Sequence, residues 1–248
     1  MRGRAPSRSG RRPPPPETHR RRSARHPVAR RRRRLHHRDA SRRGRNGRST
    51  VPPRESSSSL PVLAGVVLAA VLAVQAFALH LYGQPTICAC GTIRLWAGDV
   101  LGPENSQQLT DWYTFSHVIH GLIFYALTTL ALPRAPLLVR FALALGVEAT
   151  WELIENSPTV IEHYRQQALA QGYVGDSVLN SCSDTVAAAF GFLLARLLPT
   201  RAAIGLAVAF ELFTAVMVRD NLTLNVIQLI HPVPAIAAWQ QGLATAVR

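Results

Sequence analysis

The sequence predicts an all-α fold: a polytopic membrane helical bundle of about five transmembrane helices, preceded by a disordered basic N-terminal tail. Three observations support this prediction. Several apolar stretches are long enough to cross a hydrocarbon core of about 30 Å, and short polar segments with proline and arginine separate them. The third observation is the distribution of charge. Of the 28 basic residues, all arginine, 20 precede Glu55, whereas the chain from Ser56 onward contains 8 arginines and 11 acidic residues.

The tail comprises residues 1–58 and consists largely of arginine, proline, serine and glycine. Such a segment buries too little apolar surface to offset chain entropy, so we expect it to be disordered. Its arginine runs would attract anionic lipid headgroups, and nucleic acid is a less favoured partner. The favoured interpretations are nevertheless a plain solvated cytoplasmic tail or a start codon assigned upstream of the true one. The remaining domain is expected over residues 59–242.

Five apolar segments are the expected spans, with the lipid bilayer as their surroundings. The polar connection 82–113 follows the first, a Pro133–Pro136 turn follows the second, and Asn156-Ser-Pro158 is a sharp helix stop after the third. The segment 221–239 is broken by His231-Pro-Val-Pro234 and is expected to be re-entrant or interfacial. The spans are expected at residues 60–81, 115–132, 137–154, 177–198 and 202–218.

Arginine placement predicts the orientation, because positively charged segments stay on the cytoplasmic side. A cytoplasmic N-terminus places the short turns with Arg134 and Arg140, and with Arg196 and Arg201, on that same side. We therefore expect a multi-pass protein of a bacterial inner membrane with its N-terminus in the cytoplasm.

Ionisable residues are rare inside membrane helices because lipid does not solvate them, yet here they recur. With the predicted orientation they gather in the leaflet away from the cytoplasm. His117 and His120 share one helix face, and two further stripes follow at helical spacing. These stripes are Glu148, Glu152 and Glu155, then Asp176, Asn180 and Asp184.

Two imidazoles among carboxylates suit a divalent metal, and we take His117 and His120 as candidate metal ligands. Without a metal, the same groups could act as general acid and base. The alternative is structural, since polar side chains also hydrogen-bond helices together in lipid. Glu211 is expected to do this or to pair with Arg219. The candidate catalytic residues are Asp111, Glu152, Glu155, Asp176 and Asp184.

Three cysteines are too few for a disulfide scaffold. Unpaired thiols are the favoured expectation for Cys88, Cys90 and Cys182, and a bridge from the Cys88–Cys90 loop to Cys182 is the alternative. The chain contains no phosphate-binding loop, no glycine-rich dinucleotide motif and no Gly-x-Ser-x-Gly elbow, so these enzyme classes are not indicated.

The chain resembles an uncharacterised family of bacterial inner-membrane proteins, a domain of unknown function. The similarity covers roughly residues 60–242 and rests on five blocks of sequence. The order of the helices that bear His, Glu and Asp-x-x-x-Asn-x-x-x-Asp is also distantly similar to VanZ-like membrane proteins, which implies a link to cell-envelope chemistry. The blocks are Glu104-Asn-Ser-Gln107, Asp111-Trp-Tyr-Thr-Phe-Ser-His117-x-x-His120-Gly121, Trp151-Glu-x-x-Glu155-Asn-Ser157, Gly175-Asp-Ser-x-x-Asn180-Ser-x-x-Asp184 and Arg219-Asp-Asn-Leu-Thr-Leu-Asn225.

Three functions therefore remain open. The first is metal-assisted or acid–base hydrolysis or transfer on a lipid-linked or envelope substrate, with Glu152 or Asp184 as base. The second is a non-catalytic binding or transport module for a cation or basic ligand. The third is a purely structural membrane protein.

Overall fold

A computed structural model of the protein describes residues 59–167, 169–170 and 172–246. These residues belong to one unit, Pro53–Arg248, and contain eight helices and no strand. The tail predicted for residues 1–58 lies outside the described residues. The helices are α1 (Ser59–Leu81), α2 (Thr114–Ala131), α3 (Leu137–Glu155), α4 (Pro158–Arg165), α5 (Val178–Leu197), α6 (Thr200–Val218), α7 (Leu222–Ile230) and α8 (Pro234–Ala246).

Four of these helices, α1, α2, α5 and α6, are long and apolar enough to cross a membrane. They match four of the expected spans to within two residues at each end. The fifth expected span coincides with α3, which has 19 residues but carries one arginine and three glutamates. Composition alone therefore identifies four spans rather than five.

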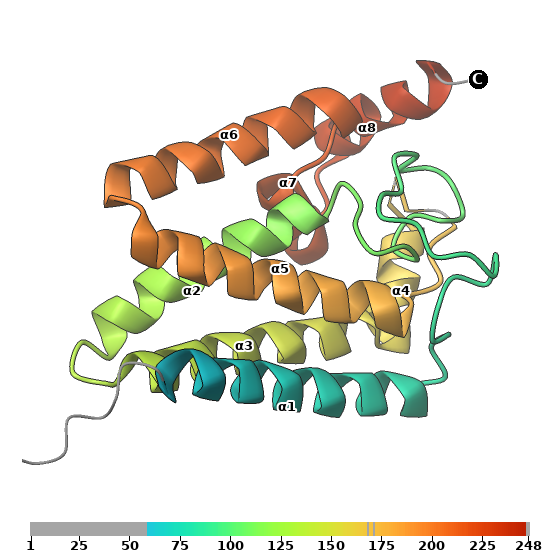
Figure 1. Ribbon diagram of the computed structural model, residues 1–248. Helices are drawn as coiled ribbons and strands as arrows, with labels where there is room; N and C mark the ends of the chain where they lie inside the picture. Colours follow the sequence, from blue (N-terminus) through green and yellow to red (C-terminus); the bar gives the residue numbers. More distant parts are fainter. Residues whose placement is uncertain (1–58, 168, 171, 247–248) are drawn as a thin grey trace, which may run out of the picture. The chain divides into compact units, whose positions relative to one another are not determined.

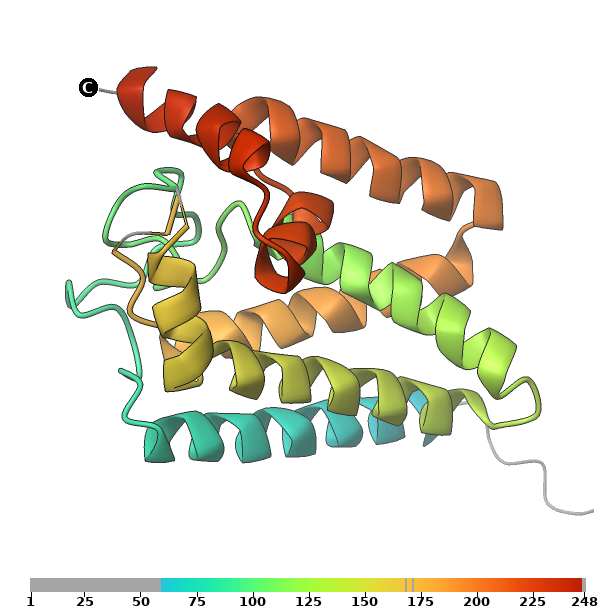
Figure 2. The same ribbon diagram turned by 180° about the vertical axis from the view of Figure 1, so that it is seen from behind.

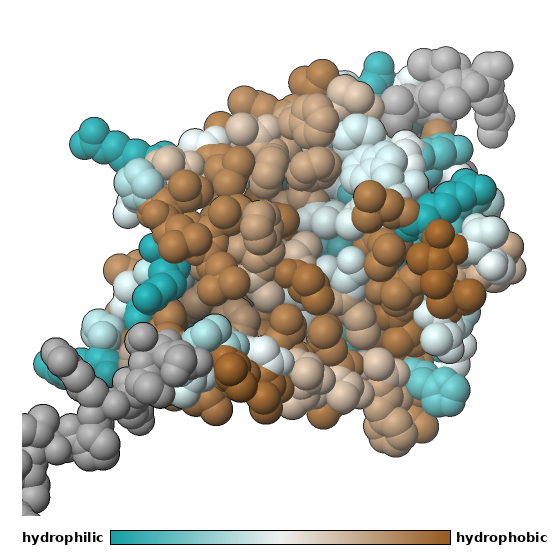
Figure 3. Space-filling model, viewed as in Figure 1, coloured by the Kyte–Doolittle hydropathy of each residue, from teal (hydrophilic) through white to brown (hydrophobic). Residues whose placement is uncertain are grey.

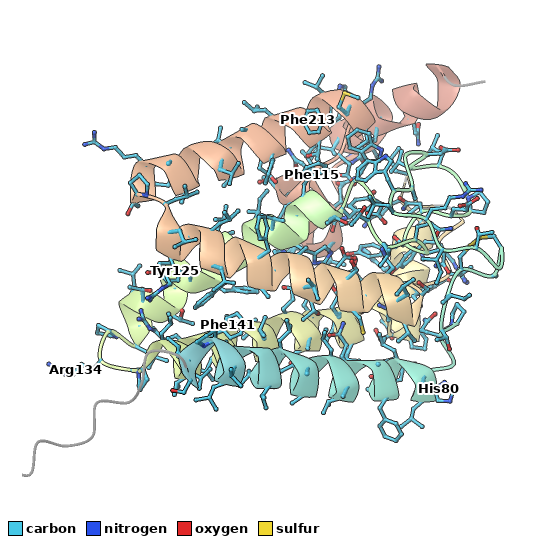
Figure 4. All side chains as sticks on the ribbon, in the orientation of Figure 1. His80, Phe115, Tyr125, Arg134, Phe141 and Phe213 are labelled. Carbon is cyan, nitrogen blue, oxygen red and sulfur yellow. A yellow bond between two sulfur atoms is a disulfide. The ribbon has the colours of Figure 1, made fainter. Side chains whose placement is uncertain are left out.

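The long helices run back and forth between two ends of the bundle. The connection 82–113 and α4 lie at one end, and the short α2–α3 and α5–α6 turns lie at the other (Figures 1 and 2). His80 and Arg134 mark these opposite ends in Figure 4. We call them the loop end and the turn end.

Helices α2 and α5 approach each other most closely where each has a glycine. A Cβ at Gly121 would lie 2.0 Å from the Ala188 carbonyl oxygen, and one at Gly191 would lie 2.1 Å from the Val118 carbonyl oxygen. Small residues allow membrane helices to pack backbone against backbone. Here they bring the start of α2, with its two histidines, directly against α5.

An apolar core fills the half of the bundle near the turn end. Its buried members are Phe141, Ala144 and Leu145 of α3 with Ala189 and Phe192 of α5. Side chains of α1 and α2 pack around this cluster. Outward, α1 and α6 expose many large apolar side chains, and hydrophobic residues cover most of the middle of the face in Figure 3, with hydrophilic residues towards its ends. This surface is suited to lipid.

Capping residues divide the loop end into short elements. Helix α3 ends at Glu155, as the Asn-Ser-Pro stop predicts, and α4 begins at once with Ser157 as N-cap and Pro158 in the first turn. Near the C-terminus, α7 and α8 contain 9 and 13 residues. At about 1.5 Å per residue, neither helix alone crosses a hydrocarbon core.

The structure corrects one sequence-based expectation and decides between the alternatives of another. Cys88 and Cys90 form a disulfide with each other, so the expectation of unpaired thiols is wrong for both, while Cys182 is free. The turn brings their Cα atoms to 5.1 Å, within the usual range for a disulfide. Of the two roles expected for Glu211, the structure shows hydrogen bonding between helices and not pairing with Arg219. The Glu211 carboxylate on α6 accepts hydrogen bonds from the backbone N–H groups of Leu222 and Thr223 at the start of α7, whereas Arg219 donates to the Trp239 carbonyl.

Candidate functional site

Two histidines and one glutamate form the centre of a buried polar cluster. Glu148 of α3 bridges the imidazoles of α2: its Oε1 lies 2.6 Å from His117 Nδ1 and its Oε2 lies 3.0 Å from His120 Nδ1. The three-residue spacing of the histidines places both on the face that meets α3. Glu148 is fully buried, so this contact fixes the orientation of both rings.

Glu152, one turn further along α3, holds an acceptor atom that is not satisfied. Its Oε2 accepts a hydrogen bond of 2.6 Å from Ser181 Oγ of α5, whereas its buried Oε1 accepts none. The ring nitrogen nearest to Oε1 is His117 Nδ1 at 3.3 Å, and that nitrogen already contacts Glu148 more closely. A buried carboxylate oxygen without a donor is costly unless a further group binds it.

Helix α1 supports this carboxylate through Gln75, which is not among the site residues predicted from the sequence. Its Nε2 donates to Ser181 Oγ at 2.8 Å, and its Oε1 accepts from Thr185 Oγ1 at 2.7 Å. Gln75 is fully buried although it interrupts an apolar helix. A lone amide in a predicted membrane span was the available signal, but its partners could not be found from spacing.

Asp184 of α5 faces the other side of the His117 ring. Its Oδ2 lies 3.8 Å from His117 Nε2, too far for a hydrogen bond, and its Oδ1 accepts from Thr114 Oγ1 at 3.1 Å. His117 is therefore held by a carboxylate at Nδ1 while Nε2 is not hydrogen-bonded to Asp184. A carboxylate behind one ring nitrogen is the usual support of a metal-binding histidine.

A cavity of about 240 Å³ opens beside this cluster at the loop end. Four carboxylates and three tyrosines line it together with His117 and several amides, and among the described residues no arginine lines it. The chain contains no lysine at all. The carboxylates are Glu155, Asp176, Asp184 and Asp220, and the tyrosines are Tyr113, Tyr164 and Tyr173.

Neutral donors hold the two cavity carboxylates that lie outside the long helices. Asp220 accepts hydrogen bonds from Tyr113 Oη at 3.1 Å, Gln240 Nε2 at 3.1 Å and the Asn221 backbone. Asp176 accepts from Asn156 Nδ2 at 2.7 Å and Tyr173 Oη at 2.9 Å. Burial raises the pKa of each carboxyl to about 6, although these hydrogen bonds oppose the shift.

The side chains of the predicted stripe Asp176, Asn180 and Asp184 do not meet at one point. Asp176 precedes the N-cap Ser177 and turns towards the end of α3, whereas Asn180 donates to the Gln108 carbonyl in the 82–113 connection. Only Asp184 faces His117. The three residues are buried, as the spacing predicts, but they meet three different neighbours.

The structure separates the predicted site residues into two groups. His117, Glu152 and Glu155 can each offer an atom within 4.8 Å of the others, and Asp176 and Asp184 line the adjoining cavity. Asp111 does not line the cavity. Its carboxylate accepts hydrogen bonds from the Ser106 and Tyr113 backbones, and burial raises its pKa. This contact holds Ser106 in its left-handed conformation (φ 60°) ahead of α2.

A second set of possible metal ligands consists of His117, His120 and Glu148. In this set both oxygens of Glu148 already contact the Nδ1 atoms of the two imidazoles, so few atoms remain to bind a metal ion. The set with Glu152 and Glu155 instead includes the carboxylate oxygen that lacks a hydrogen bond and adjoins the cavity. Among the described residues, it is the better candidate for holding a cation.

Comparison with known proteins shows the family. The family described as "Protein of unknown function (DUF2585)" matches residues 79–242. The chain belongs to this family. A "UPF0314 protein" of Brucella anthropi is 51% identical over 181 residues, which cover 73% of this chain and 92% of that protein. One from Sphingopyxis alaskensis is 51% identical over 177 residues, covering 71% and 94%, and one from Rhizobium etli is 51% identical over 178 residues, covering 72% and 91%.

The family and these bacterial relatives confirm the predicted resemblance to an uncharacterised bacterial family. They lend no support to the more distant similarity to VanZ-like proteins. No solved structure matches the chain. The matched region contains every predicted site residue and ends after Gln240, but it begins beyond Gln75.

Proposed function

We propose that this DUF2585 protein crosses a bacterial inner membrane five times, with its N-terminus in the cytoplasm. Both α2 and α5 begin at the loop end, so the chain must return across the bundle between them (Figure 1). Helix α3 makes that return, and its 19 residues extend about 28 Å. Arginines in or beside the turns after α2 and α5, namely Arg134, Arg196 and Arg201, favour a cytoplasmic turn end.

We infer that the function supported best is the binding of a divalent cation between His117, Glu152 and Glu155. The observation that carries this inference is the buried Glu152 Oε1, which accepts no hydrogen bond. A metal ion would supply the missing positive partner, and oxygen and imidazole ligands suit ions such as Zn²⁺ or Mn²⁺. Glu148 would stay behind His117 and orient its ring.

The surroundings of the cluster oppose an anionic ligand. Four carboxylates line the adjoining cavity, and no arginine lines it in the part of the chain that the structure describes. An anion placed there without a metal would meet like charges in a low dielectric, which is strongly unfavourable. The charge balance therefore favours the cation-binding reading over direct recognition of a phosphate group.

The apolar core argues against a conduit through the bundle. Phe141, Leu145 and Phe192 are almost fully buried between the polar cluster and the turn end. An ion at His117 would have to pass this tightly packed layer to reach the other side. The site is therefore open only at the loop end of the bundle, which in the proposed orientation is the periplasmic end.

A second function is favoured by the pairing of His117 with Glu148. An imidazole oriented by a buried carboxylate is suited to proton transfer, and a bound metal would activate water beside it. Metal-assisted or acid–base hydrolysis or transfer on an envelope substrate is then the corresponding activity, with Glu152 or Asp184 as the base.

Metal content tests the cation site directly. The full chain, purified in detergent, would be loaded with Zn²⁺ or Mn²⁺, desalted and analysed by plasma mass spectrometry. We expect about one ion per chain, lost in Glu152→Gln and in His117→Ala. Glu162→Gln is the matched control, because Glu162 is exposed and pairs with Arg165. No retained metal in the folded wild type, or equal retention in all variants, overturns the proposal.

A further inference from the structure

The outer part of the cavity has a chemistry that a cation does not satisfy. Two amides on its wall have a buried polar atom with no hydrogen-bond partner: Asn105 Oδ1, an acceptor, and Gln167 Nε2, a donor. They come from separate segments, the 82–113 connection and the turn after α4. The wall therefore offers one acceptor and one donor that have no hydrogen-bond partner, and a ligand would have to supply a donor for the first and an acceptor for the second.

Only some ligands can supply both groups. A metal ion or an ammonium group could interact with Asn105 Oδ1, but neither accepts a hydrogen bond from Gln167 Nε2. An anion could accept from Gln167 but would face the four cavity carboxylates. A hydroxyl group both donates and accepts and carries no charge, so it fits the two amides and the carboxylates together.

The rest of the wall is suited to a ring that carries several hydroxyls. Asp176 and Asp220 offer carboxylate acceptors. Tyr164 and Tyr173 lie with ring centroids 5.6 Å apart and give an aromatic surface. The cavity of about 240 Å³ is smaller than the roughly 300–1,000 Å³ typical of sites for drug-sized ligands. It is suited to a group of about the size of one sugar ring.

We propose that the outer cavity binds an uncharged polyhydroxylated ring, such as a monosaccharide unit, beside the cation cluster. This inference shares the cavity of the proposed function but depends on different atoms, chiefly those of Asn105 and Gln167. The ring could be a free sugar or the headgroup of a membrane glycolipid, because both present the same hydroxyls.

The test measures melting temperature against matched ring compounds. The full chain would be purified in lauryldimethylamine oxide, because the headgroup of a maltoside detergent is itself a polyhydroxylated ligand. Methyl glucoside, glucosamine and glucuronate present a similar ring with neutral, positive and negative charge. We expect methyl glucoside to raise the melting temperature by about 3–6 °C at about ten times its Kd, and glucuronate to have no effect.

Variants locate the binding. Gln167→Glu keeps the shape of the side chain but replaces the donor with an acceptor, and we expect it to weaken methyl glucoside binding about tenfold. Asn105→Ala should act in the same direction, while Gln166→Ala, at an exposed neighbouring position, should have no effect. A response to glucosamine alone, no response to any neutral ring, or an unchanged Kd in both variants overturns the proposal.

Two further measurements separate the alternatives. Stronger binding of octyl glucoside below its micelle concentration than of methyl glucoside would support a glycolipid headgroup, and equal binding would support a free sugar. Metal retention and methyl glucoside binding, both measured on the wild type, distinguish this proposal from the cation site. If the wild type binds methyl glucoside but retains no metal, only the cation proposal fails. If metal is retained and no neutral ring binds, only the sugar proposal fails.

Discussion

Replacing Gly121 with alanine tests the close approach of α2 and α5 that positions His117. The added Cβ would lie 2.0 Å from the Ala188 carbonyl oxygen and 2.6 Å from the Phe192 nitrogen. Both are backbone atoms of a helix and cannot rotate away. To restore an ordinary contact of 3.4 Å, the two helices would have to separate locally by about 1.4 Å.

Overpacking of this kind typically costs about 1–3 kcal/mol, and a clash with rigid backbone belongs at the upper end. At about 2–4 °C per kcal/mol for a protein of this size, Gly121→Ala should lower the melting temperature by about 6–12 °C. Gly146→Ala on α3 is the matched control, because its Cβ would meet nothing within 4 Å. That change should be neutral or stabilising by about 0.5–1 kcal/mol, since alanine favours helix.

The same substitution should disturb the site. Separation of α2 from α5 would move both His117 and Thr114 away from the Asp184 carboxylate and so disturb the position of His117. Metal retention should therefore fall together with the melting temperature. Thermal unfolding followed by circular dichroism gives the first quantity, and mass spectrometry gives the second. A Gly121→Ala protein that melts within about 2 °C of Gly146→Ala would refute the close α2–α5 packing.

Two further predictions concern buried polar groups. Gln75→Leu removes the amide that holds Ser181 and Thr185 and should lower the free energy of unfolding by about 1–3 kcal/mol, as measured in thermal melts. Val74→Leu, at an exposed position on the same helix, is the control and should leave this free energy unchanged. Equal melting temperatures of the two variants would contradict this role of Gln75. Burial raises the pKa of Asp220 from 3.8 to about 6, so the folded state holds the proton more tightly than the unfolded chain does. The free energy of unfolding should therefore fall by up to about 3 kcal/mol as pH rises from about 4 to 6, and then stay level. Asp220→Asn should abolish this part of the pH dependence, as measured by melting between pH 4.5 and 7, and an identical pH profile in variant and wild type would disprove it.

Helical periodicity predicts the faces of the bundle well because a side chain's face depends only on its position within the helix. The spacing of Glu148 and Glu152 places both on one stripe, and the structure buries both. Hydropathy likewise locates α1, α2, α5 and α6, since a span must be continuous in sequence. It marks α3 less clearly, because the same residues that build the polar cluster lower its apolar character.

Contacts between distant segments could not be predicted in this way. Gln75 meets Ser181 and Thr185, which are 106 and 110 residues away, and no local pattern connects them. Tyr113 meets Asp220 across 107 residues in the same manner. The prediction for Asp111 considered only its place near the histidines, whereas the fold of the 82–113 connection directs its carboxylate to the Ser106 and Tyr113 backbones.

The bond between Gln75 and Ser181 also has a consequence for how the protein is made. At roughly 5–20 residues per second, the ribosome needs about 5–20 s to synthesise the 106 residues that separate them. During that interval α1 is complete while its amide has no partner in α5. Glu152 emerges before Ser181 as well, so in the proposed membrane topology a nascent chain that stops short of α5 would present two polar groups to lipid. If the helices insert into a membrane as proposed, completion of α5 is the step at which we expect them to become a stable bundle, and chains arrested before it should be substrates for membrane quality control.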